Sequence, residues 1–339
     1  EYNSGTINNN SYSTATVNGG TDETGGLVAI NEDGGIIADC YATGSVTGTT
    51  YVGGLVGHNH ASSGESATIT DCYATGSVTG TTYVGGLVGH NYAQNGDATI
   101  TGSYATGNVT GNGDYVGGLV GYNRARNDNT TIVTDCYATG TVTGNDEVGG
   151  LVGYNTGDNW DDDGIITNCY ATGSVSGVTD VGGLVGYNEN NNITISYATG
   201  NVTGTTYVGG FVGYNYGDYG IIADCYATGN VTGTGNYVGG FVGRHYFYSS
   251  ISRCYSTGLK SSGSGSGFYG VASEHASISD SYYNSETSSC SWFHTGGAVT
   301  AKTTSEMMTQ ATFSGWTFDA SNWGIVEGET YPYLAALHT

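Results

Sequence analysis

The chain has 339 residues, with 61 Gly and 29 Tyr but only one Pro and six basic residues. Its formal net charge of −23 excludes the basic surface that binding to nucleic acid or to anionic lipid requires. No stretch reaches the ~20 apolar residues that span a bilayer, so we expect no membrane insertion. The chain begins at Glu1 without a charged and apolar leader, as expected for a mature secreted chain.

Residues 1–31 precede a tandem repeat and carry a weak version of its pattern. Ile7, Tyr12, Ala15 and Val17 mark short strands in a segment without Pro, Lys, Arg or a helical pattern. Unprotected strand edges can pair with another chain. We therefore expect an incomplete first coil that serves as an assembly segment. It would pair head to tail with a second copy, or with a neighbouring domain of a longer protein.

Residues 32–253 consist of copies of one pattern. Tyr-Ala-Thr-Gly-x-Val-[Thr/Ser]-Gly occurs with its tyrosines 27 to 33 residues apart, and Val-Gly-Gly-[Leu/Phe]-Val-Gly follows each time. The tyrosines are Tyr41, Tyr73, Tyr104, Tyr137, Tyr170, Tyr197 and Tyr226. This period indicates a repeat architecture whose Gly residues form tight corners, and no helical periodicity survives them.

Alternation within a copy indicates half-buried strands. Cys40, Ala42 and Val46 share one parity and are expected to face the core. Ile37 has the wrong parity for the same flat strand, so a corner or bulge must separate it from Cys40. Periodicity does not decide which of Leu55 and Val56 points inward. The pattern predicts an all-β fold, a parallel β-solenoid of about eight to nine coils stacked ~4.8 Å apart, with a small C-terminal cap.

Stacking would align equivalent residues of successive coils into ladders. One ladder of Asn residues ends the Gly-x-Asn segment, and its amides are expected to hydrogen-bond from coil to coil in a structural role. Its members are Asn31, Asn59, Asn91, Asn123, Asn155, Asn188 and Asn215. The repeat tyrosines, with a weak further copy at Tyr255, form an outward ladder. That ladder either stacks on itself or presents ring faces to sugars or to another fibril.

The repeat degenerates towards the C-terminus. Residues 254–300 are expected to form degenerate terminal coils, and residues 301–339 a cap. Thr303-Thr-Ser-Glu306 has the pattern of a capping box that opens a short helix. Trp316 and Trp323 can cover the last coil.

Six of the seven Cys share one repeat position and fall in adjacent copies. The pairs are Cys40 with Cys72, Cys136 with Cys169, and Cys225 with Cys254. In-register neighbours lie inside the disulfide range of Cα separations, although their Cβ atoms would be wider apart than preferred. Three disulfides and six free buried thiols are both open alternatives.

One loop is rich in carboxylates. Asp158, Asp161, Asp162 and Asp163 supply the oxygen ligands that calcium prefers, but without the spacing of a known calcium loop. Calcium is therefore the one candidate ion, and we expect no other cofactor. His58 and His90 share a repeat position that Tyr occupies in later copies, which favours a corner role over a metal site.

The Gly-Gly-Leu-Val-Gly segment with its Tyr-Ala-Thr-Gly-x-Val-x-Gly partner resembles the Glug-motif repeat. The resemblance covers roughly residues 12 to 275. It implies an extracellular or surface-attached bacterial protein of adhesin type, and it supplies no catalytic residues to transfer.

We therefore expect a secreted structural protein of the cell surface, a subunit of a fibre or filament that assembles head to tail. An adhesin stalk that binds glycans or a partner surface is the alternative. A polysaccharide-active enzyme ranks third, because a catalytic site is normally a local departure from a repeat, whereas Asp39, Asp71, Asp135 and Asp224 belong to the repeat. We expect no enzymatic activity.

Overall fold

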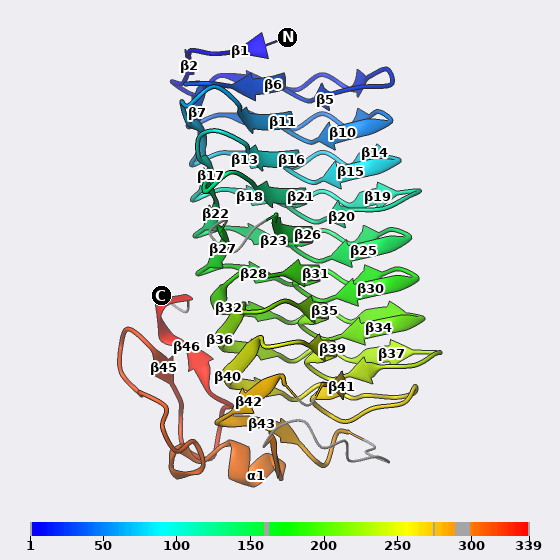
Figure 1. The fold of residues 1–339 in the computed structure, drawn as a ribbon, viewed down its shortest axis with the longest axis vertical. Coiled ribbons are helices and arrows are strands. Elements are labelled where there is room, and N and C mark those ends of the chain that lie inside the picture. Colours follow the sequence, from blue (N-terminus) through cyan, green and yellow to red (C-terminus); the bar gives the residue numbers. More distant parts are fainter. Residues whose placement is uncertain (1, 159–162, 274, 289–298, 338–339) are drawn as a thin grey trace.

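A computed structural model describes residues 2–158, 163–273, 275–288 and 299–337. The chain winds into a parallel β-solenoid, a rod of stacked coils that confirms the predicted fold (Figure 1). Equivalent residues of successive coils pair in register, as where Tyr41 lies opposite Tyr73. The coils build four long sheets, which we call sheets A to D.

Sheet A has ten strands, with β1 and β41 at its two ends. They are β1 (Tyr2–Asn3), β6 (Val28–Glu32), β11 (Val56–Ala61), β16 (Val88–Ala93), β21 (Val120–Ala125), β26 (Val152–Gly157), β31 (Val185–Glu189), β35 (Val212–Tyr216), β39 (Val242–Tyr246) and β41 (Tyr269–Ala272).

Sheet B has 18 short strands, mostly two to a coil. They are β2 (Thr6–Ile7), β3 (Tyr12–Ser13), β7 (Ile36–Ala38), β8 (Tyr41–Ala42), β12 (Ala67–Thr70), β13 (Tyr73–Ala74), β17 (Ala98–Thr101), β18 (Tyr104–Ala105), β22 (Thr130–Thr134), β23 (Tyr137–Ala138), β27 (Asp163–Thr167), β28 (Tyr170–Ala171), β32 (Ile193–Ala198), β36 (Ile221–Ala227), β40 (Ser250–Ser256), β42 (Ser277–Ser279), β43 (Ser281–Asn284) and β44 (Val299–Lys302).

Sheets C and D have eight strands each. Sheet C contains β4 (Val17–Asn18), β9 (Val46–Thr47), β14 (Val78–Gly80), β19 (Val109–Gly111), β24 (Val142–Thr143), β29 (Val175–Ser176), β33 (Val202–Gly204) and β37 (Val231–Gly233). Sheet D contains β5 (Thr24–Gly25), β10 (Thr50–Gly53), β15 (Thr82–Gly85), β20 (Val116–Gly117), β25 (Asp146–Gly149), β30 (Thr179–Gly182), β34 (Thr206–Gly209) and β38 (Val238–Gly239).

Each coil has a wide part and a narrow arm. Sheets A and B enclose the main core, which contains the inward Cys and Ala of the repeat together with Ile and Leu. Sheets C and D form the arm, which is closed by a separate cluster of Val side chains such as Val46 and Val52. Leu55 and Val56 are both fully buried in the main core, because the chain bends at the preceding Gly-Gly pair.

The corner predicted between Ile37 and Tyr41 lies at Asp39. Its φ of 53° places it in the left-handed region, and the repeat residues Asp71, Asp135 and Asp224 have φ between 51° and 56°. Asp tolerates this conformation because its short side chain can hydrogen-bond locally. The recurring carboxylates are therefore corner residues of sheet B, as their membership of the repeat suggested.

The Gly-Gly pair lets neighbouring coils approach each other closely. A Cβ atom at Gly118 would lie 2.0 Å from the carbonyl oxygen of Gly150 in the next coil, and 3.0 Å from the Cβ of Ala138. No side chain fits in this space. This contact explains why the second Gly of the pair recurs in every copy.

The two ends of the rod differ. The first coil, residues 2–18, contributes β1 to sheet A, β2 and β3 to sheet B and β4 to sheet C. The first coil continues into β5 (Thr24–Gly25), which begins sheet D, so this coil supplies strands to all four sheets and the expectation of an incomplete first coil is not met. The outer edge of this coil is uncovered in Figure 1.

The other end carries the predicted short helix, α1 (Thr304–Met307), with a capping box between Thr303 and Glu306. After the short 3-10 turn η1 (Gln310–Thr312), strands β45 (Trp323–Gly324) and β46 (Tyr333–Leu334) pair antiparallel, and η2 (Ala335–Leu337) follows. This segment was expected to cover the last coil. It also turns back along the flank of sheet B, where Figure 1 shows it beside β36 and β40. The division into four segments along the chain stays a prediction.

Candidate functional site

The Asn ladder lies at the corner between sheets A and B. Each amide Nδ2 donates to the Oδ1 of the next Asn, over 2.7 to 2.8 Å along the seven predicted residues. The other amide hydrogen reaches the start of the following segment, as where Asn59 donates to the carbonyl of Ala67. All seven are fully buried. The ladder therefore fastens the corner of every coil and fastens each coil to the next.

Two further residues extend this ladder beyond the prediction. Asn3 of the first coil donates to Asn31. At the other end Asn215 donates to Nδ1 of the buried His245, 3.1 Å away, and Nε2 of His245 lies 3.3 Å from the carbonyl of Ser277. Every described amide points the same way. Asn3 could have been predicted from the sequence, because it lies 28 residues before Asn31 in a degenerate copy of the repeat. His245 could not, because it replaces the Asn that marks this position in the other copies.

The outward Tyr ladder stacks on itself. Rings from Tyr12 to Tyr255 lie 4.7 to 5.1 Å apart between centroids and within 8° of parallel. Each ring therefore covers the face of its neighbour, and solvent meets ring edges. Of the two alternatives, the structure has self-stacking. The rings at Tyr197, Tyr226 and Tyr255 are also covered by Trp316, Trp323 and Leu334 of the C-terminal segment.

A second aromatic band was missed. It covers sheets A and D, and its first lane has residues with φ between 48° and 63° directly before the Val-Gly-Gly segment. These are Tyr51, Tyr83, Tyr115, Glu147, Asp180, Tyr207 and Tyr237. Their side chains lie against the outward residues of sheet A, for example Tyr51 with its ring 5.2 Å from that of His58. The sequence signal for this band was the Tyr that recurs directly before the Val-Gly-Gly segment of most copies.

Glu147 and Asp180 interrupt this band. They occupy the Tyr position in two successive coils, whose strands β25 and β30 pair in register. Burial, then the charge of neighbouring Asp114 and Asp146, raises the pKa of Glu147 to about 7. Burial and the neighbouring charge of Glu147 raise the pKa of Asp180 to about 8. Asp180 is 7% exposed and its buried Oδ1 has no hydrogen-bond partner among the described residues.

His58 and His90 belong to the same band. Their rings stack 4.7 Å apart, and His90 stacks on Tyr122 of the next coil. Burial lowers the pKa of His58 to about 3, so the imidazole is neutral. Neither ring nitrogen of the buried His90 has a hydrogen-bond partner in the described part of the chain. The histidines are thus aromatic spacers in a tyrosine position. Among the described residues no group of three His, Cys, Asp or Glu could hold a metal ion.

The six repeat cysteines line the inner face of sheet B. Of the two alternatives, the structure has free thiols: Cys40, Cys72, Cys136, Cys169, Cys225 and Cys254 are all unbridged and buried. Each donates to the carbonyl two residues before it, as Cys72 does to Thr70 over 3.1 Å. Burial raises the pKa of Cys72 to about 12, which keeps it a thiol. Cys290 lies outside the described residues.

The proposed calcium loop is described only in part. Asp161 and Asp162 lie outside the described residues, and Asp163 begins β27. The carboxylate of Asp158 pairs with Arg124 at 2.7 Å and with Arg126 at 2.6 Å. Two guanidinium groups therefore already neutralise this carboxylate. Calcium binding at this loop stays a prediction.

The predicted assembly residues lie on the first coil. Ile7 packs against the main core and Val17 against the Val cluster of the arm. Tyr12 starts the Tyr ladder and is 60% exposed, because it has a neighbouring ring on one side. The exposed Ala15 lies between β3 and β4, and its carbonyl is close to Gly44. These residues extend the ladders of the rod by one coil.

The stacked coils and their buried ladders define a repeat protein of the parallel β-solenoid class. A family model described as the GLUG motif matches eight consecutive segments: residues 20–47, 48–79, 80–110, 112–143, 144–176, 177–203, 204–232 and 234–262. The chain belongs to the GLUG-motif family. No curated protein and no solved structure gave a significant match. No helix in the described part of the chain is long and apolar enough to cross a membrane.

Proposed function

We propose that this protein is an extracellular structural subunit that assembles head to tail into a fibre through its first coil. The open outer edge of residues 2–18 carries this proposal. Within the described residues 2–18 every strand ends its sheet, and this segment contains no helix, Pro or Lys that would block the approach of another strand. Such an edge is a template for β-pairing.

Specific backbone groups are available for this pairing. The carbonyls of Ser11 and Ser13 accept hydrogen bonds from the second coil, at 3.2 and 2.9 Å. Because backbone groups alternate in direction along a strand, the N–H and C=O of Tyr12 face outward. The same alternation turns those of Thr6 and Thr16 outward, since Gly5 and Val17 bond to the second coil.

Polarity supports head-to-tail rather than head-to-head contact. All described coils run in the same direction, so β1 of one copy would continue sheet A of the next copy in the same parallel sense beyond β41. A heterologous contact of this kind gives an open filament when its rotation does not close a ring. The acidic composition and membership of the GLUG-motif family support the extracellular location in this proposal.

The test compares two double variants of the purified full chain. Thr6→Pro with Thr16→Pro removes two outward N–H groups from the edge, whereas Thr6→Ala with Thr16→Ala keeps them. We expect filaments in electron micrographs of the wild type and the Ala variant, and monomers for the Pro variant. Sedimentation velocity gives the same comparison in solution. Monomeric wild-type protein at high concentration, or filaments of the Pro variant, would overturn the proposal.

A further inference from the structure

The repeat is broken at one corner near the C-terminal end of the rod. Between sheets A and B, the preceding coil has Gly217 with a φ of 133°, and in this coil Phe247 takes that place with a φ of 67°. Bulky residues rarely take the left-handed conformation, although the Tyr residues of the aromatic band also have it in this protein. This conformation places the Phe247 ring at the surface, 37% exposed, next to Tyr248 at 55%.

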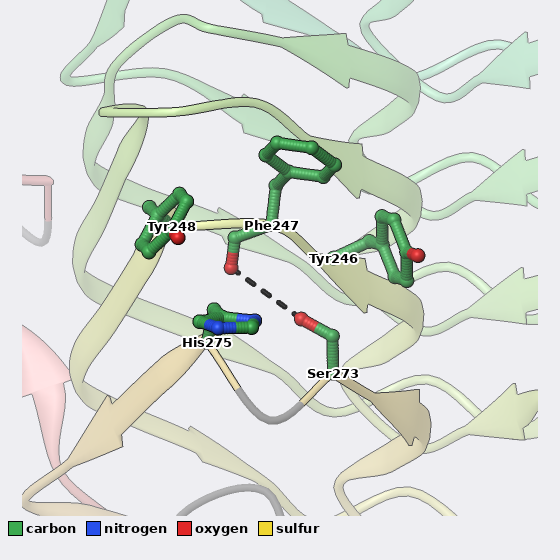
Figure 2. Close-up of a pocket in the computed structure, with 5 residues that line it drawn as sticks. All are labelled: Tyr246, Phe247, Tyr248, Ser273 and His275. Carbon is green, nitrogen blue, oxygen red and sulfur yellow. Dashed lines mark hydrogen bonds between the residues drawn. The ribbon is translucent and has the colours of Figure 1, made fainter.

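These rings do not stack as the ladders do. Tyr246 and Phe247 are inclined by 55°, Phe247 and Tyr248 by 79°, and Tyr248 and His275 by 54°. The rings of the Tyr ladder, in contrast, lie within 8° of parallel. Figure 2 shows the Phe247, Tyr248 and His275 rings around a common hollow. Ring faces that the ladders hide are therefore accessible here.

The hollow is a pocket built by two coils. Tyr246, Phe247 and Tyr248 come from one coil, and Ser273 and His275 from the next, where they form the lower wall in Figure 2. The hydroxyl of Ser273 donates to the carbonyl of Phe247 over 3.4 Å, and its N–H donates to the carbonyl of His245 over 3.0 Å. The volume of about 500 Å³ is that of a small-molecule site.

The chemistry of the lining selects among ligands. It offers aromatic faces for C–H groups, and hydroxyl and imidazole groups that can donate and accept hydrogen bonds. The guanidinium of Arg244 lies 4.5 Å from the Tyr246 ring centroid, so a cation already occupies that ring. An anion would meet the field of a chain with a net charge of −23. With cations and anions disfavoured, the lining suits a neutral ring that has one apolar face and hydroxyl groups around its rim.

We propose that this pocket, which we call the Phe247 pocket, binds a neutral pyranose unit of a glycan or polysaccharide. One face of the sugar packs on the Phe247 and Tyr248 rings. Its hydroxyls exchange hydrogen bonds with Ser273, His275 and the tyrosine hydroxyls. The pocket lies many coils away from the open edge of the first coil, whereas its Ser273 directly follows β41, the strand that a second copy would extend in the proposed fibre.

The experiment measures binding by isothermal titration calorimetry of the full chain. The probes are neutral cello-, malto-, manno- and galacto-oligosaccharides, with oligogalacturonate as acidic probe and tetramethylammonium as cationic probe. We expect saturable binding of at least one neutral oligosaccharide. Phe247→Gly suits the left-handed backbone while it removes the ring, so it is expected to fold and to weaken this binding at least tenfold. Tyr219→Ala, an exposed aromatic outside the pocket, is the matched control and should leave affinity unchanged.

Three results would overturn the proposal. The first is no saturable binding of any neutral oligosaccharide, and the second is unchanged affinity in Phe247→Gly. The third is binding of oligogalacturonate or tetramethylammonium alone, which would assign the pocket to a charged ligand. A circular dichroism melt shows that each variant is folded before its affinity is compared. Filament formation is judged by its own measurement, the electron micrographs of the Thr6 and Thr16 variants, so failure of sugar binding and failure of assembly are distinguishable.

Discussion

Buried amides hold the coils together one residue at a time. Asn123 donates to Asn155 and to the hydroxyl of Thr131, and accepts from Asn91. Because it has no contact with water, every one of these bonds must be made within the protein. Its loss leaves groups of three neighbours unpaired at once.

Asn123→Ala is therefore expected to lower the free energy of unfolding by roughly 2 to 4 kcal/mol, since each unpaired buried group costs about 1 to 3 kcal/mol. Chemical denaturation monitored by circular dichroism measures the change. The control is Asn112→Ala, a substitution of the same type at an exposed turn. Equal stability of the two variants would contradict a clamping role for the ladder.

The acidic pair in the aromatic band gives a dependence on pH. The pKa of Asp180 is raised above its ordinary value, so the native chain binds more protons than the unfolded chain between about pH 4 and 8. The free energy of unfolding from this group therefore falls as the pH rises through that window. Glu147 and Asp146 add to the effect, and Arg244 opposes it.

Asp180→Asn removes this proton uptake. We expect it to raise the free energy of unfolding by roughly 1 to 3 kcal/mol at pH 8 and to leave it unchanged at pH 4. Thermal melts at both pH values measure the difference. Asp22→Asn, an exposed position, should show no such contrast. A gain of equal size at pH 4 would show that the charge of Asp180 is not its source.

The buried imidazole of His90 makes the free energy of unfolding depend on pH in the opposite direction. Burial and the nearby His58, His60 and Arg124 hold its pKa well below the ordinary value. The native chain then binds fewer protons than the unfolded one below about pH 6.5, so this contribution to stability is lost as the pH falls. His90→Tyr should reduce the drop in melting temperature between pH 7 and pH 5. The reciprocal change, Tyr122→His, should increase it, and a failure of both would exclude this titration.

At the scale of the coil, close backbone contact between neighbouring coils requires glycine at the second position of the Gly-Gly pair. Gly118→Ala would force the Gly150 carbonyl away from its place, and we expect a cost of about 3 kcal/mol from this overpacking. Gly20→Ala is the control, because a Cβ there has no atom within 4 Å. Denaturant midpoints of the two variants measure the contrast. A Gly118→Ala variant as stable as the control would show that the coils can separate at no cost.

The local sequence pattern predicted most of the coil but not the first lane of the aromatic band. The parity change between Ile37 and Cys40 required a corner, and it lies at Asp39. The left-handed backbone at Tyr51 could not be expected, because few bulky residues take a positive φ. The alternation of inward and outward residues also failed to predict the orientation of Leu55 and Val56. The Gly-Gly bend before them lets both residues face the same core. Such a bend depends on the next coil and is not visible within one segment.

Contacts between distant segments were also beyond the sequence. The hydroxyl of Tyr255 donates to the carbonyl of Pro332, 77 residues later, and Trp323 Nε1 donates to Asp224 over 3.2 Å. No periodicity signals a segment that turns back along a ladder. The Phe247 pocket was missed for a related reason, since it joins two coils at a place where the repeat is lost. Its signal is the run of three aromatic residues from Tyr246 to Tyr248.

For the whole molecule, coils that contact only their neighbours should unfold locally. Trp323 is 1% exposed and covers Tyr226 and Tyr255 at the C-terminal end. Trp323→Ala should therefore increase hydrogen exchange in residues 221–283 and leave the coils before residue 160 unchanged. Val326→Ala, an exposed residue of the same segment, is the control. A uniform increase along the chain would indicate a single cooperative unit.

The corner after the Asn ladder separates a constant part of the rod from a variable one. Loops of different lengths follow it in successive coils, such as residues 62–66 and 217–220, while the Asn of the clamp recurs from Asn31 to Asn215 and is not replaced until the next coil, by His245. Coils could thus be duplicated, removed or exchanged without loss of register, and a new loop would need to satisfy only its own surroundings. In the described part of the chain these loops fall on one longitudinal edge of the rod, and the Phe247 pocket lies on it. A rod of this design can change its exposed loops while its scaffold stays the same.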